Sequence, residues 1–379
     1  MTEQEAYVAF NLTENIGSVG VARLAAAANR SVADAWELYD KKASRLDGRP
    51  VDWKAEMDKA RAAGVAILTP ADAEYPRQLL DVASHPLVLY VKGDPGVLSR
   101  PSLALVGTRR ATAYGLDQAF RFGRDLAANG WAIVSGLALG IDGEAHRGAL
   151  DAGGIAIGVL GSALNRFYPE QNLPLARDIV KRGGAVVSEF PFGRAPDQQT
   201  FPQRNHVVAA LARGVLAIEA PAKSGTLITM NLAAEIGRAV MAVPGRVDSR
   251  SCAGCLQLIR NGATLVRCAE DVEEEMGGLL RQRVRSDAPA HGAPSRHGAP
   301  RAPQGVLRMP SSAAADGECA MEEARVMREV DEEGVAMDEL VRRTGLAAAK
   351  VNAAAMSLLL KGRVRFLPGD RVALPRNFK

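Results

Sequence analysis

Seven short apolar runs alternate with longer segments of helical periodicity, and this alternation most constrains what the chain can fold into. Continuous apolar strands that alternate with amphipathic helices are typical of a parallel sheet covered on both faces. The pattern therefore predicts an α/β fold with a Rossmann-like, doubly wound, mostly parallel sheet at residues 86–274. The apolar runs are 103–107, 131–136, 155–161, 185–190, 215–220, 240–245 and 263–267.

The first 85 residues have a different pattern. Residues 1–85 carry helical periodicity, with Ser31 and Asp52 as expected N-caps, and predict a small all-helical domain. The stretch 16–20 is expected to form a small-residue turn between helices, as in helix-hairpin-helix or SAM-like modules. Such a turn can bind DNA backbone through its amides. No basic cluster flanks it, so packing or dimerisation is favoured over DNA contact.

The C-terminal residues 319–379 predict three helices followed by a two-stranded hairpin, the arrangement of a winged-helix domain. The third helix is largely apolar and the hairpin is more basic. A module that contacts protein, or weakly contacts DNA backbone, is therefore favoured over a sequence-specific reader of the major groove. The polar side chains in question are Lys350, Asn352 and Ser357 on the third helix and Arg363, Arg365 and Arg371 on the hairpin.

Residues 275–318 are rich in Ala, Pro and Gly and predict a flexible linker. Within them, 281–310 holds six arginines and one aspartate, an excess of five positive charges. The net charge of the whole chain is only +4. The positive net charge is therefore no argument for nucleic-acid binding by a folded domain.

Composition points to a globular protein, with 47% hydrophobic and 24% charged residues. No run approaches the roughly 18 apolar residues of a membrane helix, and the N-terminus lacks the pattern of a signal peptide. A soluble, cytoplasmic protein without membrane association is expected. The four cysteines fit a reducing compartment, and Cys252 and Cys255 lack a second pair to complete a zinc site. No metal or cofactor is predicted.

Glycines, hydroxyls and basic residues follow several predicted strands, at the sheet edge where doubly wound folds bind ligands. Glycine lets a backbone approach a ligand closely, and helix N-termini present free N–H groups to anions. Arg109 and Lys223 would add fixed positive charge. The sequence predicts a site for phosphate groups. Its candidate residues are Gly107, Thr108, Arg109, Arg110, Ser135, Gly136, Gly140, Lys223, Ser224, Gly225 and Thr226.

The stretch "SGLALGIDGEAH" also places Asp142, Glu144 and His146 close together, which first suggests an acid/base or metal centre. Asp142 and His146 would share one helical face, but no further ligand and no nucleophile with a matched base accompanies them. Asp142 is expected to cap the helix and hold the turn, and His146 to pack or hydrogen-bond locally. The chain also lacks the glycine motifs of dinucleotide and P-loop sites. From these observations together, no catalytic residue is predicted.

Several motifs between residues 103 and 263 together resemble the DprA/Smf family, the DNA-processing proteins of bacterial natural transformation. The resemblance implies a non-enzymatic protein that binds single-stranded DNA without strong sequence preference. It also implies a homodimer that helps to load the RecA recombinase onto the strand. The motifs are "LALVGTRRATAYG", "IVSGLALGIDGEAHRGAL", "FYPEQN", "SEFPFG", "FPQRNHVVAAL", "EAPAKSGTLITMNLAAE", "AVPG" and "LIRNGA".

The resemblance also implies roles for single residues. Arg109 matches the arginine of the family's Gly-Thr-Arg motif, and Lys223 matches the lysine of its Lys-Ser-Gly motif. The family usually has Arg-Asn-Arg where this chain has Arg204-Asn205-His206. A histidine is mostly neutral near pH 7, so a basic contact at His206 would be weaker. Arg204 is therefore the DNA-binding candidate of that motif.

Two other classes of function stay open on the sequence. Nucleotide phosphoribohydrolases of the lysine-decarboxylase-like Rossmann group have a Gly-Thr turn and a downstream glutamate. Gly225-Thr226 and Glu235 echo this arrangement, but the accompanying Pro-Gly-Gly run is absent. A transcription factor that acts through the C-terminal domain, with the sheet as a nucleotide sensor, is disfavoured by the apolar third helix.

Overall fold

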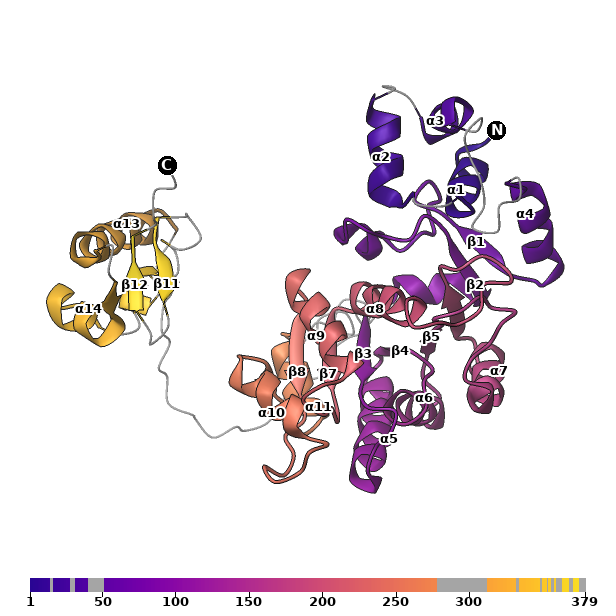
Figure 1. The fold of residues 1–379 in the computed structure, drawn as a ribbon. Coiled ribbons are helices and arrows are strands. Elements are labelled where there is room, and N and C mark those ends of the chain that lie inside the picture. The colour runs from indigo at the N-terminus through magenta and orange to yellow at the C-terminus, as the bar shows by residue number, and fades with distance from the viewer. Residues whose placement is uncertain are drawn as a thin grey trace, which may run out of the picture. The chain divides into compact units, whose positions relative to one another are not determined.

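The computed structural model describes residues 1–13, 16–27, 31–39, 51–277, 312–331, 334–347, 350–352, 354–355, 358, 363–367 and 371–374. The chain divides into two compact units, residues 1–290 and 291–379 (Figure 1). Most of the expected linker, residues 278–311, lies outside the described residues.

The first unit is built on a nine-stranded sheet with the order β1-β2-β6-β5-β4-β3-β7-β8-β9. The strands from β3 to β9 run parallel, whereas β1 pairs antiparallel with β2 and β2 antiparallel with β6. All seven predicted strands are present, and the doubly wound fold is confirmed. The strands are β1 (Ala66–Leu68), β2 (Leu89–Gly93), β3 (Ser102–Val106), β4 (Ala132–Ser135), β5 (Ala156–Val159), β6 (Ala185–Ser188), β7 (Gly214–Ala217), β8 (Ala239–Ala242) and β9 (Thr264–Leu265).

Helices cover both faces of this sheet. Leu103 and Leu105 of β3 belong to the core that α5, α6, α7 and α11 cover. Ala104 and Val106 of the same strand belong to the core under α8, α9 and α10. Because side chains alternate along a strand, β3 supplies both cores. The helices are α5 (Ala113–Ala128), α6 (Ile141–Asp151), α7 (Leu173–Lys181), α8 (Thr200–Leu211), α9 (Gly225–Glu235), α10 (Ala253–Arg260) and α11 (Ala269–Glu275), with short 3₁₀ turns η2 (Arg77–Asp81), η3 (Pro95–Ser99) and η4 (Glu170–Asn172).

The N-terminal helices form a third core around Phe10 and Trp36, which also includes Tyr90 of β2. Both expected caps are present: the amide of Asp34 donates to Ser31 Oγ at 3.1 Å, and that of Ala55 to Asp52 Oδ1 at 2.9 Å. The helices are α1 (Glu3–Asn11), α2 (Ser18–Ala27), α3 (Val32–Tyr39) and α4 (Trp53–Ala62).

Two expectations for this region were wrong. The turn expected at 16–20 is shorter, because α2 already begins at Ser18. Residues 1–85 are also not purely helical, because β1 lies within them and extends the sheet. A three-residue strand is too short to show periodicity in the sequence.

The second unit has the helices and wing of a winged-helix domain around its own core, which includes Val326, Leu340 and Val351. Two details differ from the expectation. A short third strand, β10, pairs with the hairpin, and α13 begins at Ser312, inside the expected linker. Ser357 and the hairpin turn at 368–370 lie outside the described residues. The elements are α13 (Ser312–Glu329), β10 (Val335–Ala336), α14 (Met337–Thr344), β11 (Arg365–Leu367) and β12 (Arg371–Ala373), with residues 350–352, 354–355 and 358 helical.

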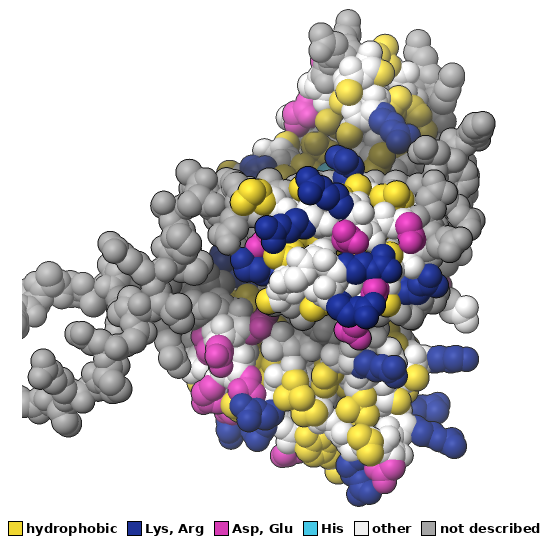
Figure 2. Space-filling view, turned by 90° about the vertical axis from the view of Figure 1, so that its left-hand side faces the viewer, with side chains coloured by type: hydrophobic (Ala, Val, Ile, Leu, Met, Phe, Trp, Pro, Cys, Tyr) yellow, Lys and Arg dark blue, Asp and Glu magenta, His cyan; other side chains and the backbone are white. Residues whose placement is uncertain are grey.

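Among the described helices, none has both the length and the apolar character needed to span a bilayer. On the face drawn in Figure 2, basic side chains are mixed with acidic and hydrophobic ones. On that face, charge of one sign does not by itself mark a binding site.

Candidate functional site

A pocket of about 400 Å³ lies at the carboxyl ends of β3, β4 and β7. The neighbours β3 and β7 lead into α5 and α9, which lie on opposite faces of the sheet. This is a topological switch point, where the loops separate and leave a crevice. Ten of the predicted site residues line the pocket, namely Gly107, Thr108, Arg109, Arg110, Gly136, Arg204, Lys223, Ser224, Gly225 and Thr226.

Ser135 and Gly140 do not line the pocket, although both support its walls. Ser135 is fully buried, and its hydroxyl donates to the Leu105 carbonyl at 2.6 Å, which ties β4 to β3. Gly140 has φ +77°, and a Cβ there would meet the carbonyl oxygen of Thr108. Its lack of a side chain thus lets the start of α6 pack against the loop that carries Arg109.

That loop, between β3 and α5, is anchored by Glu219 at the end of β7. The Glu219 carbonyl accepts from the Thr108 amide at 2.8 Å, and its carboxylate accepts from the Thr112 amide at 2.9 Å. Thr112 in turn caps α5, because its hydroxyl accepts from the Gly115 amide at 3.1 Å. Glu219 is buried and positions the loop, a role that its isolated place in the sequence did not indicate.

Arg204 forms part of the pocket floor and is only 5% exposed. Its Nη1 donates to the carbonyls of Gly136 and Val159, the latter at 2.6 Å. The Asp142 carboxylate accepts from the Gly136 amide at 3.1 Å. Burial lowers the pKa of Arg204 and raises that of Asp142, and the charge of each group opposes the shift of the other. Main-chain carbonyls of the protein therefore hold the Arg204 side chain in place.

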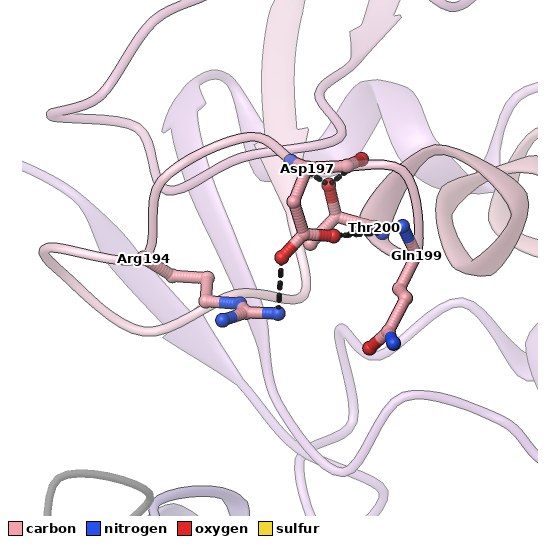
Figure 3. A network of polar contacts seen from close by, with 4 residues as sticks. All are labelled: Arg194, Asp197, Gln199 and Thr200. Carbon is pink, nitrogen blue, oxygen red and sulfur yellow. Dashed lines mark hydrogen bonds and ion pairs between the residues drawn. The ribbon is translucent and has the colours of Figure 1, made fainter.

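At three of the four helix N-termini around the pocket, groups of the protein itself already accept hydrogen bonds from the first amides. The start of α5 is capped by Thr112, as described above. At the start of α6, the Ile141 amide donates to the Thr108 carbonyl at 3.3 Å. Before α8, Asp197 accepts from the amides of Gln199 and Thr200 and pairs with Arg194 at 2.6 Å (Figure 3). These contacts satisfy amides that a bound anion would otherwise need.

The start of α9 is different. The side chain of its N-cap residue, Ser224, makes no capping hydrogen bond, and the Ser224 hydroxyl is buried without a partner in the described structure. The first amides of a helix point outward and carry partial positive charge, so this end can bind an anion. Lys223 stands immediately before it and is exposed.

Two of the basic side chains that line the pocket, Arg109 and Lys223, are exposed. Within the described residues, neither Arg109 nor Lys223 forms an ion pair, and Arg109 instead lies over the ring of Phe201 at 4.6 Å. Arg204 Nε also has no hydrogen-bond partner there. Two free cations beside an open helix N-terminus are suited to phosphate groups.

The three residues that first suggested catalysis do not face a common space. Asp142 lines the pocket, but it holds the 136–138 turn rather than capping α6, whose N-cap is Gly140. His146 is fully buried, and burial lowers its pKa to about 3. Glu144 pairs with Arg147 at 2.7 Å. No group of three or more His, Cys, Asp or Glu suited to a metal occurs in the described part of the chain.

His206, which replaces the family's arginine, faces Glu189 at 3.8 Å rather than the pocket. Burial lowers the pKa of His206 to about 4 and raises that of Glu189 to about 8. Both groups are therefore neutral at pH 7, and the contact is not an ion pair. His206 brings no charge to the phosphate site.

Sequence reasoning missed several residues that line the pocket. Phe201 and Asn205 come from the first turns of α8, and Ile228 and Thr229 from α9. Phe201 stands three residues before Arg204, one helical turn away, so it shares the helix face that points into the pocket. That spacing in "FPQRNH" was the available signal.

Comparison with known proteins gives a consistent result. Residues 66–277 match the family model described as DNA recombination-mediator protein A, and residues 310–370 match the DprA winged helix domain. Protein Smf of Escherichia coli is 36% identical over 310 residues, which cover 82% of this chain and 78% of that protein.

Two solved structures are also similar. DNA processing protein A of Streptococcus pneumoniae superposes with a TM-score of 0.60 at 31% identity, covering 73% of this chain and 98% of that one. The protein of the same name from Helicobacter pylori, described for its single-stranded DNA binding mode, has a TM-score of 0.51 at 27% identity. That match covers 59% of this chain and 96% of the other. With the family model, the sequence relatives and the fold in agreement, the chain belongs to the DprA/Smf family of DNA recombination mediators.

Proposed function

We propose that this chain binds single-stranded DNA through its sugar-phosphate backbone in the pocket at the carboxyl ends of β3, β4 and β7. The observation that carries the proposal is the pair of unpaired cations, Arg109 and Lys223, beside the uncapped start of α9. A strand's phosphates need positive charge and backbone donors, and they need no reaction centre. The single-stranded DNA binding mode described for the Helicobacter pylori relative supports the same assignment.

Family membership supports a wider role. The protein is a recombination mediator by family, and in this proposal it loads RecA onto incoming single strands during natural transformation. It works in the cytoplasm, where the recombinase and the strand meet, as a homodimer and without enzymatic activity. All twelve predicted contact residues belong to this proposal, with Ser135, Gly140 and Arg204 as supports of the site rather than direct contacts.

The test is a salt titration of binding to an oligothymidine strand. Arg109→Ala and Lys223→Ala should each weaken binding about 10- to 100-fold, because a hydrogen bond to a charged group contributes about 1.5–3 kcal/mol. Each should also reduce the slope of log K against log salt by about 0.7. The loss should be the same for other base sequences. Arg213→Ala, an exposed arginine at the amino end of β7, is the matched control and should bind normally. Unchanged binding by the double variant at the pocket would exclude it as the DNA site.

The competing assignment as a phosphoribohydrolase is not favoured by the position of Glu235. This glutamate is the last residue of α9, whereas the Gly225-Thr226 turn is at its start. The two ends of such a helix lie roughly 15 Å apart. Glu235 does not line the pocket, so it could not assist a reaction there. Release of free base from a nucleoside monophosphate, lost in Glu235→Gln, would reverse this conclusion.

The C-terminal unit contributes little to this proposal. Lys350 pairs with Glu322 at 2.6 Å, and Arg371 donates to the Gly334 carbonyl at 2.7 Å. The apolar residues of the third helical segment, such as Val351 and Leu358, belong to the unit's own core. Their apolar character therefore no longer favours a protein contact over a backbone contact, and the partner of this unit stays a prediction.

A further inference from the structure

An exposed aromatic side chain stands beside the phosphate pocket. Tyr168, in the loop between β5 and α7, is 46% exposed. Its ring lies 5.9 Å from that of Phe201, with the two planes tilted by 56°. Phe201 lines the pocket and carries Arg109 over its ring at 4.6 Å. Tyr168, Phe201 and Arg109 thus form a continuous series of flat groups that runs from outside the pocket to its cationic wall.

The middle member of this series is held in place. Phe201 packs over Gly161 at the end of β5, where an added Cβ would lie 2.9 Å from its ring. Its helix start is fixed by the Asp197 contacts of Figure 3. Because these contacts hold Phe201 in place, the ring of Tyr168 that packs beside it is positioned at the surface by the protein alone.

We propose that Tyr168 is a base-stacking platform for a nucleotide next to the one whose phosphate enters the pocket. This inference rests on the proposed function and deepens it, because it assigns a nucleobase subsite to a surface outside the pocket. Proteins that bind single strands without sequence preference combine a cationic track with aromatic rings, since every base has a π face. The ring can stack any base, so it adds affinity without adding sequence specificity.

The alternative is that Tyr168 only covers Phe201 and so steadies Arg109. The two roles differ in what they require of the DNA. A stacking platform needs a base, whereas support of Arg109 acts on phosphate binding alone. A strand with the same phosphates but no bases therefore separates them.

The experiment compares oligothymidine with an abasic strand of equal length, using full-length protein. We expect Tyr168→Ala and Tyr168→Leu to weaken oligothymidine binding about 5- to 100-fold, the range expected for loss of one base stack. The abasic strand should bind both variants as it binds the unaltered protein, and the salt slope should not change. Tyr168→Phe should restore binding, because the ring is kept. Leu38→Ala, a remote exposed side chain on α3, is the surface control.

A spectroscopic readout complements the affinities. Tyr168→Trp places an indole at the platform, and its fluorescence should change on binding oligothymidine but not the abasic strand. Equal losses on both strands in Tyr168→Ala, or no loss on either, would overturn the inference. Failure of the unaltered protein to bind either strand would instead contradict the proposed function, so the two failures are distinguishable.

Discussion

At the scale of single residues, two arginines of the same pocket have opposite environments. Arg109 is exposed and lies on an aromatic ring, whereas Arg204 is buried and donates to two main-chain carbonyls. Both were predicted as DNA contacts, Arg109 from its Gly-Thr-Arg motif and Arg204 from its Arg-Asn-His motif. Because Arg204 is buried, it belongs to the scaffold that holds Gly136 in place. Arg109 is exposed, so its charge is the one that is free to meet a phosphate group.

The first prediction tests this division. Arg204→Met should destabilise the fold by about 3 kcal/mol or more, because it leaves the two carbonyls unsatisfied and the buried Asp142 without a compensating charge. Arg110→Met, an exposed arginine of the same pocket, should leave stability nearly unchanged. Urea denaturation measures both. Normal stability of Arg204→Met together with lost DNA binding would make Arg204 a direct contact instead.

The second prediction concerns Glu189, whose pKa burial raises from 4.5 to about 8. Between these values the folded protein holds a proton that the unfolded chain releases. The free energy of unfolding contributed by this group is therefore fully present below pH 4.5 and is lost as pH rises to about 8. Glu189→Gln cannot ionise and should lack this loss.

The measurement is urea denaturation of both proteins at pH 6.5 and pH 8.5. The variant should gain stability relative to the unaltered protein on going to the higher pH. His206, with a pKa lowered to about 4, is present in both proteins and should cancel from the comparison near and above pH 6.5. A difference that stays constant between the two pH values would contradict the raised pKa of Glu189.

At the scale of elements, the tight approach of α6 to the β3 loop depends on glycine. Gly140 has φ +77° and ψ −129°, a conformation essentially limited to glycine, and backbone atoms of Thr108 and Arg109 fill the space where a Cβ would lie. Gly153, at the end of α6, also has a positive φ of +68°, but nothing lies near its missing side chain. Both glycines have a backbone conformation that is strained for any other residue, but only Gly140 has neighbouring atoms that a Cβ would displace. Substituting each of them therefore distinguishes the two costs.

The third prediction uses this pair. Gly153→Ala should cost about 1 kcal/mol of stability from its conformation alone. Gly140→Ala should cost clearly more, and it should also weaken oligothymidine binding because the loop with Arg109 must move. Denaturation and binding assays on the two variants give the comparison. Equal effects of both substitutions would show that the contact between α6 and the loop is dispensable.

The elements themselves were largely predictable from sequence. The seven parallel strands have continuous apolar runs, and their helices have amphipathic periodicity, so both leave a strong signal. The β1 strand was missed because three residues cannot show a period. The β2 strand was missed as well, although "LVLYVKG" contains an apolar run, because it lies next to the region assigned as helical. Neither strand contributes a residue to the pocket.

At the scale of the whole molecule, the two units each have a core of their own. All lining residues of the phosphate pocket belong to the first unit. The fourth prediction follows: a chain that ends at residue 290 should fold and bind oligothymidine as tightly as the full chain. Circular dichroism and a binding titration provide the check. A large loss of affinity in a folded fragment would assign DNA binding to the C-terminal unit as well.

The sequence by itself determined the fold class and the edge of the sheet where the site lies. Alternating strands and helices imply a doubly wound sheet, and the carboxyl ends of its strands meet at one edge, so motifs far apart in the chain could be placed together. Only the tertiary structure decided which side chains are free to act. Whether Arg204, Asp142 or His146 is buried, and whether Tyr168 reaches Phe201, depends on packing between segments that no local pattern records. Burial and partner contacts, rather than residue type, distinguish a ligand-binding charge from a structural one.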